Sequence, residues 1–245
     1  MKKKIFILSG FLLLSLFSSA QNNLKVVYLE ETTLSLGKNS LLLRLLGAEE
    51  KNFSTPYTLW HTQGKSIYKK SGEEEVSGFQ ESDGVEVEIE SDGSEKNVHF
   101  RNHLEKKSIS LLHYMDRTFL IEEPLVAKKW TLCKKDKKIS NYLCKKATLP
   151  NGKREIIAWY APDIPVSEGP MQYFGLPGLI LELHIGENTK ITAQKISFPQ
   201  EVPELQAPKG GKKMTREEYT AMRKKKENRT KKKSSDGVIV EIEEE

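Results

Sequence analysis

The chain has 245 residues, of which 37% are hydrophobic and 30% charged, and its formal net charge is +5. This length can bury one large core or two small ones without many disulfides. The positive charge is concentrated in the first four residues and in residues 209–233, where twelve lysines and arginines outnumber three glutamates. The rest of the chain carries little net charge, which argues against a nucleic-acid-binding core.

The first twenty residues have the pattern of a secretory signal peptide. Three lysines precede an apolar run over residues 5–17, and the small residues Ser18 and Ala20 follow it. The run is too short to span a bilayer comfortably, so cleavage before Gln21 is favoured over an uncleaved anchor. We therefore expect residues 1–20 to be removed and the protein to be exported, either into the periplasm or in association with the outer membrane.

Alternating apolar and polar residues predict that most of the remaining chain forms β-strands. The alternation is found at residues 24–36, 85–90, 109–114, 119–122, 155–160 and 190–193. Turn signals with the spacing of an antiparallel meander stand at residues 83–84, 92–93, 151–152 and 186–188. We predict a mainly β protein, with a single antiparallel, strongly curved sheet or half-barrel-like domain over residues 21–202.

A charged tail, partly helical or disordered, is expected over residues 203–245. The helix prediction covers residues 215–226, where Thr215 is in position to be the N-cap and Glu218 completes a capping box. Lysines and arginines gather at the far end of this segment, where the helix dipole favours them. The cations predict contact of the tail with anionic surfaces such as lipid headgroups, and a solvated spacer is the alternative.

The stretch GLPGLI at residues 175–180 predicts a sharp corner that leads into a strand. Pro177 presets the backbone for the second position of a type II turn, and Gly178 supplies the positive φ that the third position needs. The apolar run that follows predicts a strand whose start is buried on both faces. Prolines at positions 162, 165 and 170 hold the preceding loop extended, and rigid loops of this kind carry binding surfaces.

Several of these segments resemble the GLPGLI family of exported bacterial proteins, which is named for the hexapeptide. The matching residues lie at 130–147, 158–160, 164–165, 169–170 and 175–180. The family usually has a Gly-Tyr pair before its central cysteine, whereas this chain has Asn141 and Tyr142 before Cys144. The resemblance implies a secreted, strand-rich protein of the bacterial envelope, and it implies no particular reaction because the family has no established activity.

Two cysteines, Cys133 and Cys144, flank a lysine-rich turn region between two strand-like runs. In an exported chain this spacing favours a disulfide across a hairpin, worth on the order of 3 kcal/mol if the bond is unstrained. Two buried thiols on neighbouring strands are the alternative. A metal site is disfavoured because no histidine lies within the hairpin.

The function predicted from these features is binding rather than catalysis. The chain has no nucleophile-elbow, phosphate-loop or zinc-protease motif. We expect a binding or accessory protein with no cofactor and no metal, whose partner is an outer-membrane or other envelope protein or an apolar ligand. The residues predicted to touch that partner, with core packing as the alternative, are Trp159, Tyr160, Tyr173, Phe174 and Leu176.

The competing hypothesis is an envelope hydrolase. Three carboxylates near the proline-rich loop, Asp163, Glu168 and Glu182, could supply a general acid and a general base if burial separated their pKa values. Solvated acids without a role are the alternative. The histidines at positions 99, 103 and 113 could share a divalent metal, but their polar surroundings favour surface histidines instead.

Overall fold

The computed structural model describes residues 23–35, 50–72, 94–152 and 154–235. The predicted signal peptide, the strand expected at residues 85–90 and the turns expected at 83–84 and 92–93 lie outside the described residues.

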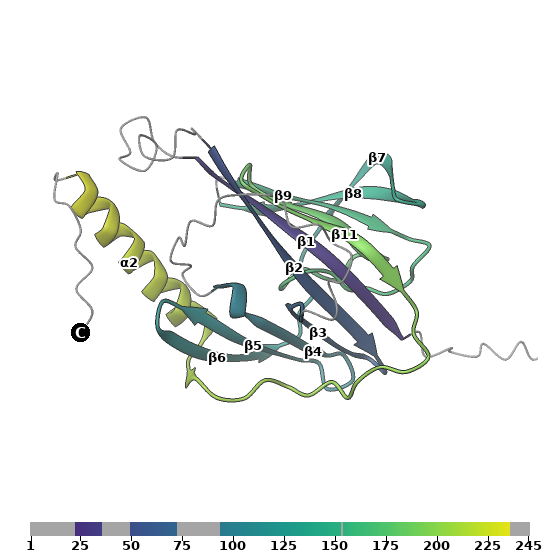
Figure 1. Cartoon of the computed structure of the whole chain (residues 1–245), viewed down its shortest axis with the longest axis horizontal. Helices are drawn as coiled ribbons and strands as arrows, with labels where there is room; N and C mark the ends of the chain where they lie inside the picture. The colour runs from purple at the N-terminus through teal and green to yellow at the C-terminus, as the bar shows by residue number, and fades with distance from the viewer. Residues whose placement is uncertain (1–22, 36–49, 73–93, 153, 236–245) are drawn as a thin grey trace, which may run out of the picture.

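Within these described residues, twelve strands form one sheet, which makes up the body of the protein in Figure 1. Its spatial order is β12-β6-β5-β4-β3-β2-β1-β11-β10-β9-β8-β7. The strands from the first half of the chain are β1 (Leu24–Ser35), β2 (Glu50–Thr62), β3 (Lys65–Lys70), β4 (Val98–Asn102), β5 (Lys107–Tyr114) and β6 (Arg117–Pro124). The second half contributes β7 (Thr131–Ile139), β8 (Tyr142–Asn151), β9 (Arg154–Ala161), β10 (Leu179–Ile185), β11 (Thr189–Ser197) and the short β12 (Lys212–Lys213).

The predicted fold class, a mainly β protein with one strongly curved antiparallel sheet, is confirmed. All neighbouring strands are antiparallel except β12, which pairs parallel to β6. In Figure 1, β1, β2 and β11 cross the centre, while β3 to β6 bend away on one side and β7 to β9 lie on the other. The sheet therefore has an inner, concave face and an outer, convex face.

Strand register places most of the large apolar and aromatic side chains on the inner face. Tyr28 lies opposite Tyr57, and Leu59 lies opposite Tyr68, so these four side chains point to the same side. They belong to one cluster of buried residues that extends into β8, β9, β10 and β11. The first five residues of β10 are all buried, as the apolar run after the corner predicts.

The segment between β9 and β10, residues 162–178, packs on the inner face, and we call it the inner loop. Two backbone bonds tie it to the start of β10: Leu179 N–H donates to the Ile164 carbonyl at 3.0 Å, and Ile180 N–H donates to the Glu168 carbonyl at 2.9 Å. The Tyr28 hydroxyl of β1 donates to the Ile180 carbonyl at 2.7 Å. The loop is thus fixed to both β10 and the neighbouring core.

The corner at residues 176–179 is tighter than the predicted type II turn. Gly178 N–H donates to the Leu176 carbonyl at 2.8 Å, which makes a three-residue γ-turn centred on Pro177. The bond that would close a type II turn is replaced because Leu179 N–H reaches Ile164 instead. The need for glycine is confirmed, since Gly178 has φ +146° and a Cβ there would lie 2.3 Å from the Ala161 carbonyl oxygen.

The predicted helix and its capping box are confirmed. Helix α2 spans Arg216–Ser235. Its N-cap, Thr215, donates its N–H to Glu218 Oε2 at 2.8 Å, and Glu218 N–H donates to Thr215 Oγ1 at 3.2 Å. Tyr219 packs against Phe119 of β6, with ring centroids 5.6 Å apart. The helix is therefore docked against the inner side of β5 and β6 through its first turns.

The chain between the sheet and the helix also packs against the sheet. Leu205, on the tail side of the predicted boundary at residue 202, is buried with Phe100, Ile109 and Leu120 on the outer face. Residues 212 and 213 then pair with β6. This packing brings α2 back to the inner side of the same strands.

The predicted disulfide is not formed, because Cys133 and Cys144 are both free thiols. In the β7–β8 hairpin, Cys144 lies opposite Lys137 and Leu132 lies opposite Ala147, with a register shift between Leu132 and Asp136. Cys133 therefore sits in the irregular stretch and out of register with Cys144. A disulfide needs Cα atoms within about 7 Å of each other, and this pairing does not bring the two cysteines into facing positions.

Candidate functional site

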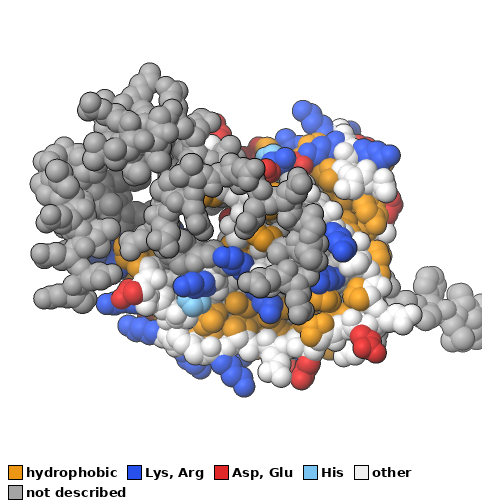
Figure 2. Space-filling view, in the orientation of Figure 1, with side chains coloured by type: hydrophobic (Ala, Val, Ile, Leu, Met, Phe, Trp, Pro, Cys, Tyr) orange, Lys and Arg blue, Asp and Glu red, His pale blue; other side chains and the backbone are white. Residues whose placement is uncertain are grey.

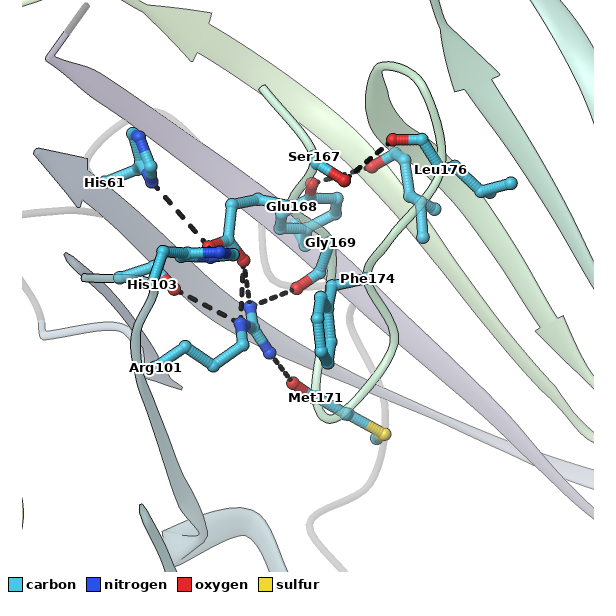
Figure 3. A network of polar contacts seen from close by, with 12 residues as sticks. His61, Arg101, His103, Ser167, Glu168, Gly169, Met171, Phe174 and Leu176 are labelled. Atoms are coloured by element: carbon cyan, nitrogen blue, oxygen red, sulfur yellow. Dashed lines mark hydrogen bonds and ion pairs between the residues drawn. The ribbon is translucent and has the colours of Figure 1, made fainter. Parts of the chain in front are cut away.

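A buried ion pair joins the inner loop to β4 (Figure 3). Arg101 Nε and Nη2 lie 2.7 and 2.6 Å from Glu168 Oε2, and His103 Nε2 lies 2.6 Å from Oε1. His61 of β2 approaches the same Oε1, with Nδ1 at 3.7 Å. The Arg101 and Glu168 side chains are 1% and 0% exposed. Glu168 is therefore a buried anion that is held by one cation and flanked by two imidazoles.

Arg101 also binds the backbone of the inner loop. Its Nη2 donates to the Gly169 carbonyl at 2.9 Å, its Nη1 donates to the Met171 carbonyl, and its guanidinium lies 5.4 Å from the centre of the Phe174 ring. A Cβ at Gly169 would lie 2.6 Å from the Tyr173 carbonyl oxygen, so a glycine is needed for the loop to fold this tightly. One arginine thus holds four residues of the loop in place.

The environment of Glu168 keeps it ionised. Burial alone would raise the pKa of this carboxyl, but the charge of Arg101, the hydrogen bond from His103 and the nearby His61 hold the pKa well below its ordinary value of 4.5. A carboxylate with such a low pKa cannot deliver a proton near neutral pH. The geometry makes Glu168 a clamp for the loop rather than a general acid.

The second buried acid, Glu182, lies on the outer face of β10. Its Oε1 accepts hydrogen bonds from Lys137 Nζ and His184 Nε2, which lower its pKa against the effect of burial. Lys137 Nζ also lies 4.6 Å from the centre of the Trp159 ring. These residues line an open outer groove of about 450 Å³, and Figure 2 shows lysine and arginine side chains gathered over β7 and β8 beside it.

The three acids of the hydrolase hypothesis are therefore not brought together. Glu168 points to the inner side, Glu182 lies on the outer face, and Asp163 is exposed on the inner loop. A general acid and base must both reach one substrate, and the sheet separates the two buried members of this set.

The five side chains predicted to touch a partner are placed mainly in the core. Trp159 is half-buried in the outer groove under Lys137. The other four, which are buried, are Tyr160, Tyr173, Phe174 and Leu176. The Phe174 carbonyl accepts a hydrogen bond from Trp130 Nε1 at 2.9 Å, so the loop is also held from the side of β7. The aromatic pair of the loop therefore anchors it, and the five do not form one exposed surface.

A cavity of about 540 Å³ lies between the inner face of the sheet, the inner loop and α2, and we call it the inner cavity. The sheet contributes Glu30, Tyr57, Tyr68 and His99 to its lining. The loop contributes residues 171–173, and α2 contributes residues including Arg216, Tyr219, Thr220 and Arg223. Its volume is within the range of small-molecule sites, roughly 300 to 1,000 Å³.

On the sheet side of the cavity lining, two polar atoms are buried without a hydrogen-bond partner among the described residues: Glu30 Oε2 and Tyr68 Oη. Burial raises the pKa of Glu30 to about 7. The pKa of Tyr68 is raised well above its ordinary value, first by burial and then by the charge of Glu30. Burial, together with Arg101 and Arg216, lowers the pKa of His99 to about 3, so this imidazole is neutral. The cavity thus contains polar groups that the described part of the chain does not satisfy.

A second cavity of about 470 Å³ lies on the other side of Gln172 and Arg216, which line both. Arg216 Nη2 lies 2.6 Å from Glu123 Oε1 of β6, so its charge is paired. Arg101 and Phe174 line this second cavity, which connects it to the ion pair below the loop. The two cavities therefore adjoin on the inner side of the sheet, and His99, like Gln172 and Arg216, lines both.

Sequence reasoning missed Glu30, Tyr68 and Arg101. Glu30 did carry a signal, because Leu24, Val26 and Glu30 lie on the same face of β1 and an acid at a core-facing position is unusual. Arg101 carried none, since a charged residue in a polar segment normally faces water. Its role depends on a loop 67 residues away in the sequence.

The part of the chain that the structure describes was also searched for metal-binding clusters and for membrane-spanning helices. It contains no cluster of three or more histidine, cysteine, aspartate or glutamate side chains arranged to hold a metal ion. Within the same residues, no helix has both the length and the apolar composition needed to cross a membrane.

Comparison with known proteins finds a family model that matches the inner loop and the strand before it. A family model described as "Protein of unknown function (Porph_ging)" matches residues 150–182, which include β9, Glu168 and the corner. This match does not confirm the resemblance to the GLPGLI family. No curated protein matches the chain.

Among solved structures, the chain is similar to PNGF-II in two crystal forms. The structure in space group P21 aligns with a TM-score of 0.54 and 12% sequence identity, and the alignment covers 83% of this chain and 33% of the PNGF-II chain. The structure in space group C2 has a TM-score of 0.50 and 13% identity, with 81% and 32% covered. The chain thus spans about a third of the length of PNGF-II. At 12 to 13% identity, this similarity shows a shared fold and nothing about function.

Proposed function

We propose that this is an exported, envelope-associated binding protein that holds a small ligand in the inner cavity. Export is supported by the signal-peptide pattern of residues 1–20 and by the resemblance to a family of exported proteins. Binding is supported above all by the inner cavity, whose floor of sheet side chains and wall of loop backbone are held in a fixed relation by the buried pair of Arg101 and Glu168. A site that is formed before the ligand arrives loses little ordering entropy on binding.

The hydrolase alternative has weaker support. Its buried acids, Glu168 and Glu182, are occupied by cations and have lowered pKa values. General acid catalysis works best with a pKa near the working pH. Both groups instead stabilise loop or strand positions, and they lie on different sides of the sheet.

The cationic tail remains a second, independent candidate for contact with the envelope. Many of the lysines and arginines of residues 209–226 are exposed along β12 and α2. Contact with anionic lipid headgroups would strengthen by about 1 kcal/mol for each cation near the surface. Such contact would bring the inner cavity close to the membrane without taking part in ligand binding.

Filling the inner cavity tests the proposed function. Thr220 is an exposed residue of α2 that lines the cavity, and Ala221 is exposed beside it without lining the cavity. The variant Thr220→Trp should lose the ligand that the parent carries when both are purified from envelope fractions and weighed by native mass spectrometry. The matched control Ala221→Trp should keep it. A parent without bound ligand, or equal loading of the two variants, would contradict the proposal.

A further inference from the structure

We propose that the ligand of the inner cavity is an uncharged, hydroxyl-rich molecule, a saccharide, and that Glu30 and Tyr68 bind one of its hydroxyl groups. This inference rests on the proposed function, because it names the chemistry of a ligand for the same cavity. It is carried by the two buried polar atoms on the cavity floor, the distribution of charge around them and the tyrosines of the wall.

The two unsatisfied atoms point to a hydroxyl group. Glu30 Oε2 accepts hydrogen bonds when the carboxyl is ionised, and the Tyr68 hydroxyl has a proton to donate. An ammonium group can only donate, so it would leave the Tyr68 proton without an acceptor. An ionised carboxylate or phosphate only accepts, so it would leave an ionised Glu30 without a donor. A ligand hydroxyl donates and accepts at once and therefore satisfies both side chains.

The two side chains face the same space, because both lie on the inner face of the sheet. Both line the inner cavity, and the charge of Glu30 contributes to the raised pKa of Tyr68. The Tyr68 side chain is 1% exposed. A buried polar group without a partner is unfavourable in the empty protein, so a ligand that supplies the partner gains affinity by removing that cost.

The charges of the lining oppose a charged ligand. The floor carries the Glu30 carboxyl, which repels an anion when ionised. The α2 wall carries Arg223 and Lys224, which repel a cation, whereas the charge of Arg216 is already paired with Glu123. These two sides of the cavity together favour a polar molecule without net charge.

The remaining wall suits a molecule with both polar and apolar faces. Tyr57 stacks on Tyr68 with ring centroids 5.1 Å apart and an interplanar angle of 7°. Tyr173 and Tyr219 line the cavity from the loop and from α2. Tyrosine rings offer flat apolar contact and a polar edge, and a sugar ring presents C–H groups on its faces and hydroxyls around its rim.

Titration of the full chain with neutral oligosaccharides tests the inference. We would use maltotriose, cellotriose, mannotriose and triacetylchitotriose, with putrescine as the cationic probe and inorganic phosphate as the anionic probe, and follow binding by saturation-transfer NMR and calorimetry. At least one trisaccharide should bind the parent, and neither charged probe should bind. The variants Tyr68→Phe and Glu30→Leu should each weaken that binding at least tenfold. The exposed neighbour Glu31 provides the control, and Glu31→Gln should bind as the parent does.

Each result separates this inference from the proposed function. If a charged probe binds in a manner that depends on Tyr68 while no saccharide binds, the saccharide assignment is wrong and the cavity remains a binding site. If a saccharide binds equally well to Tyr68→Phe, Glu30→Leu and the parent, the assignment of the two anchoring residues is overturned. If no probe binds and the parent also carries no ligand from the envelope, both proposals fail together.

Discussion

Burial of the Glu30 carboxyl group opposes the stability of the fold. It faces the inner cavity, where its Oε2 has no partner among the described residues, and burial raises its pKa from 4.5 to about 7. An acid whose pKa is higher in the folded chain favours folding below its unfolded pKa, and this contribution is lost as the pH rises through the folded pKa. In the ligand-free protein, Glu30 therefore disfavours folding at neutral and higher pH.

The variant Glu30→Gln should remove this pH dependence. Compared with the parent, it should be more stable by about 2 to 3 kcal/mol at pH 8, and the difference should shrink between pH 7 and pH 4.5. Urea unfolding at several pH values measures it. The exposed variant Glu31→Gln is the control and should follow the parent closely. An effect of Glu30→Gln that does not change with pH would contradict the assigned pKa.

Glu168 should behave in the opposite way, because it stabilises the fold as an anion. Its pKa is lowered, so its contribution is present above about pH 4.5 and is lost as the pH falls through the folded pKa. Glu168→Gln would leave Arg101 buried without a counter-charge, and this should cost about 3 to 5 kcal/mol at pH 7.

Glu182 provides the comparison for Glu168. Its partners Lys137 and His184 are 35% and 34% exposed, so water can solvate them when the carboxylate is removed. Glu182→Gln should therefore cost about 1 kcal/mol or less. Unfolding midpoints in urea decide between the two predictions, and equal losses for the two variants would show that burial of the partner is not what sets the cost.

At the scale of elements, the corner between the inner loop and β10 depends on the absence of a side chain. A Cβ at Gly178 would lie 2.3 Å from the Ala161 carbonyl oxygen, whereas a Cβ at Gly152, in the β8–β9 hairpin with φ +62°, meets no atom within 4 Å. Gly178→Ala should destabilise the protein by about 3 kcal/mol or more. Gly152→Ala should cost only about 1 kcal/mol for the strained φ. Thermal unfolding measures both, and a smaller loss for Gly178→Ala than for Gly152→Ala would exclude the close approach.

The elements that sequence predicts well are those set by local pattern. Strands β1, β5, β6, β9 and β11 follow from alternation, because a half-buried strand must alternate. The capping box of α2 follows from Thr215 and Glu218, which lie within one helical turn. Glycine at position 178 is likewise dictated by the chain at that point.

The features that sequence reasoning gets wrong depend on distant partners. The turn type at Pro177 is decided by the Ile164 carbonyl, which takes the Leu179 N–H. The disulfide prediction is wrong because the pairing of β7 with β8 changes register between Leu132 and Asp136, which places Cys133 out of line with Cys144. The spacing of the two cysteines in the sequence does not specify that change of register. The role of Glu168 is decided by Arg101, which is far away in the chain and unremarkable in its own segment.

At the scale of the whole molecule, the inner loop connects two parts of one sheet. The loop leaves β9 and returns at β10, whereas Arg101 lies on β4, and β3, β2, β1 and β11 stand between β4 and β10 in the sheet. The ion pair and the Arg101 bonds to the loop backbone thus span the concavity. They hold the loop as one wall of the inner cavity, so the stability of the fold and the shape of the proposed site depend on the same contacts.

A double-mutant cycle on this pair tests the connection. Arg101→Met would leave Glu168 buried and uncompensated, Glu168→Leu would do the same to Arg101, and each should cost about 3 to 5 kcal/mol. The double variant has no unpaired buried charge, so it should be less destabilised than the sum of the singles by 2 kcal/mol or more. It should not recover the parent's stability, because the Gly169 and Met171 carbonyls lose their donor. Urea unfolding of the four proteins gives the coupling energy, and strictly additive losses would mean that the pair does not act as a unit across the sheet.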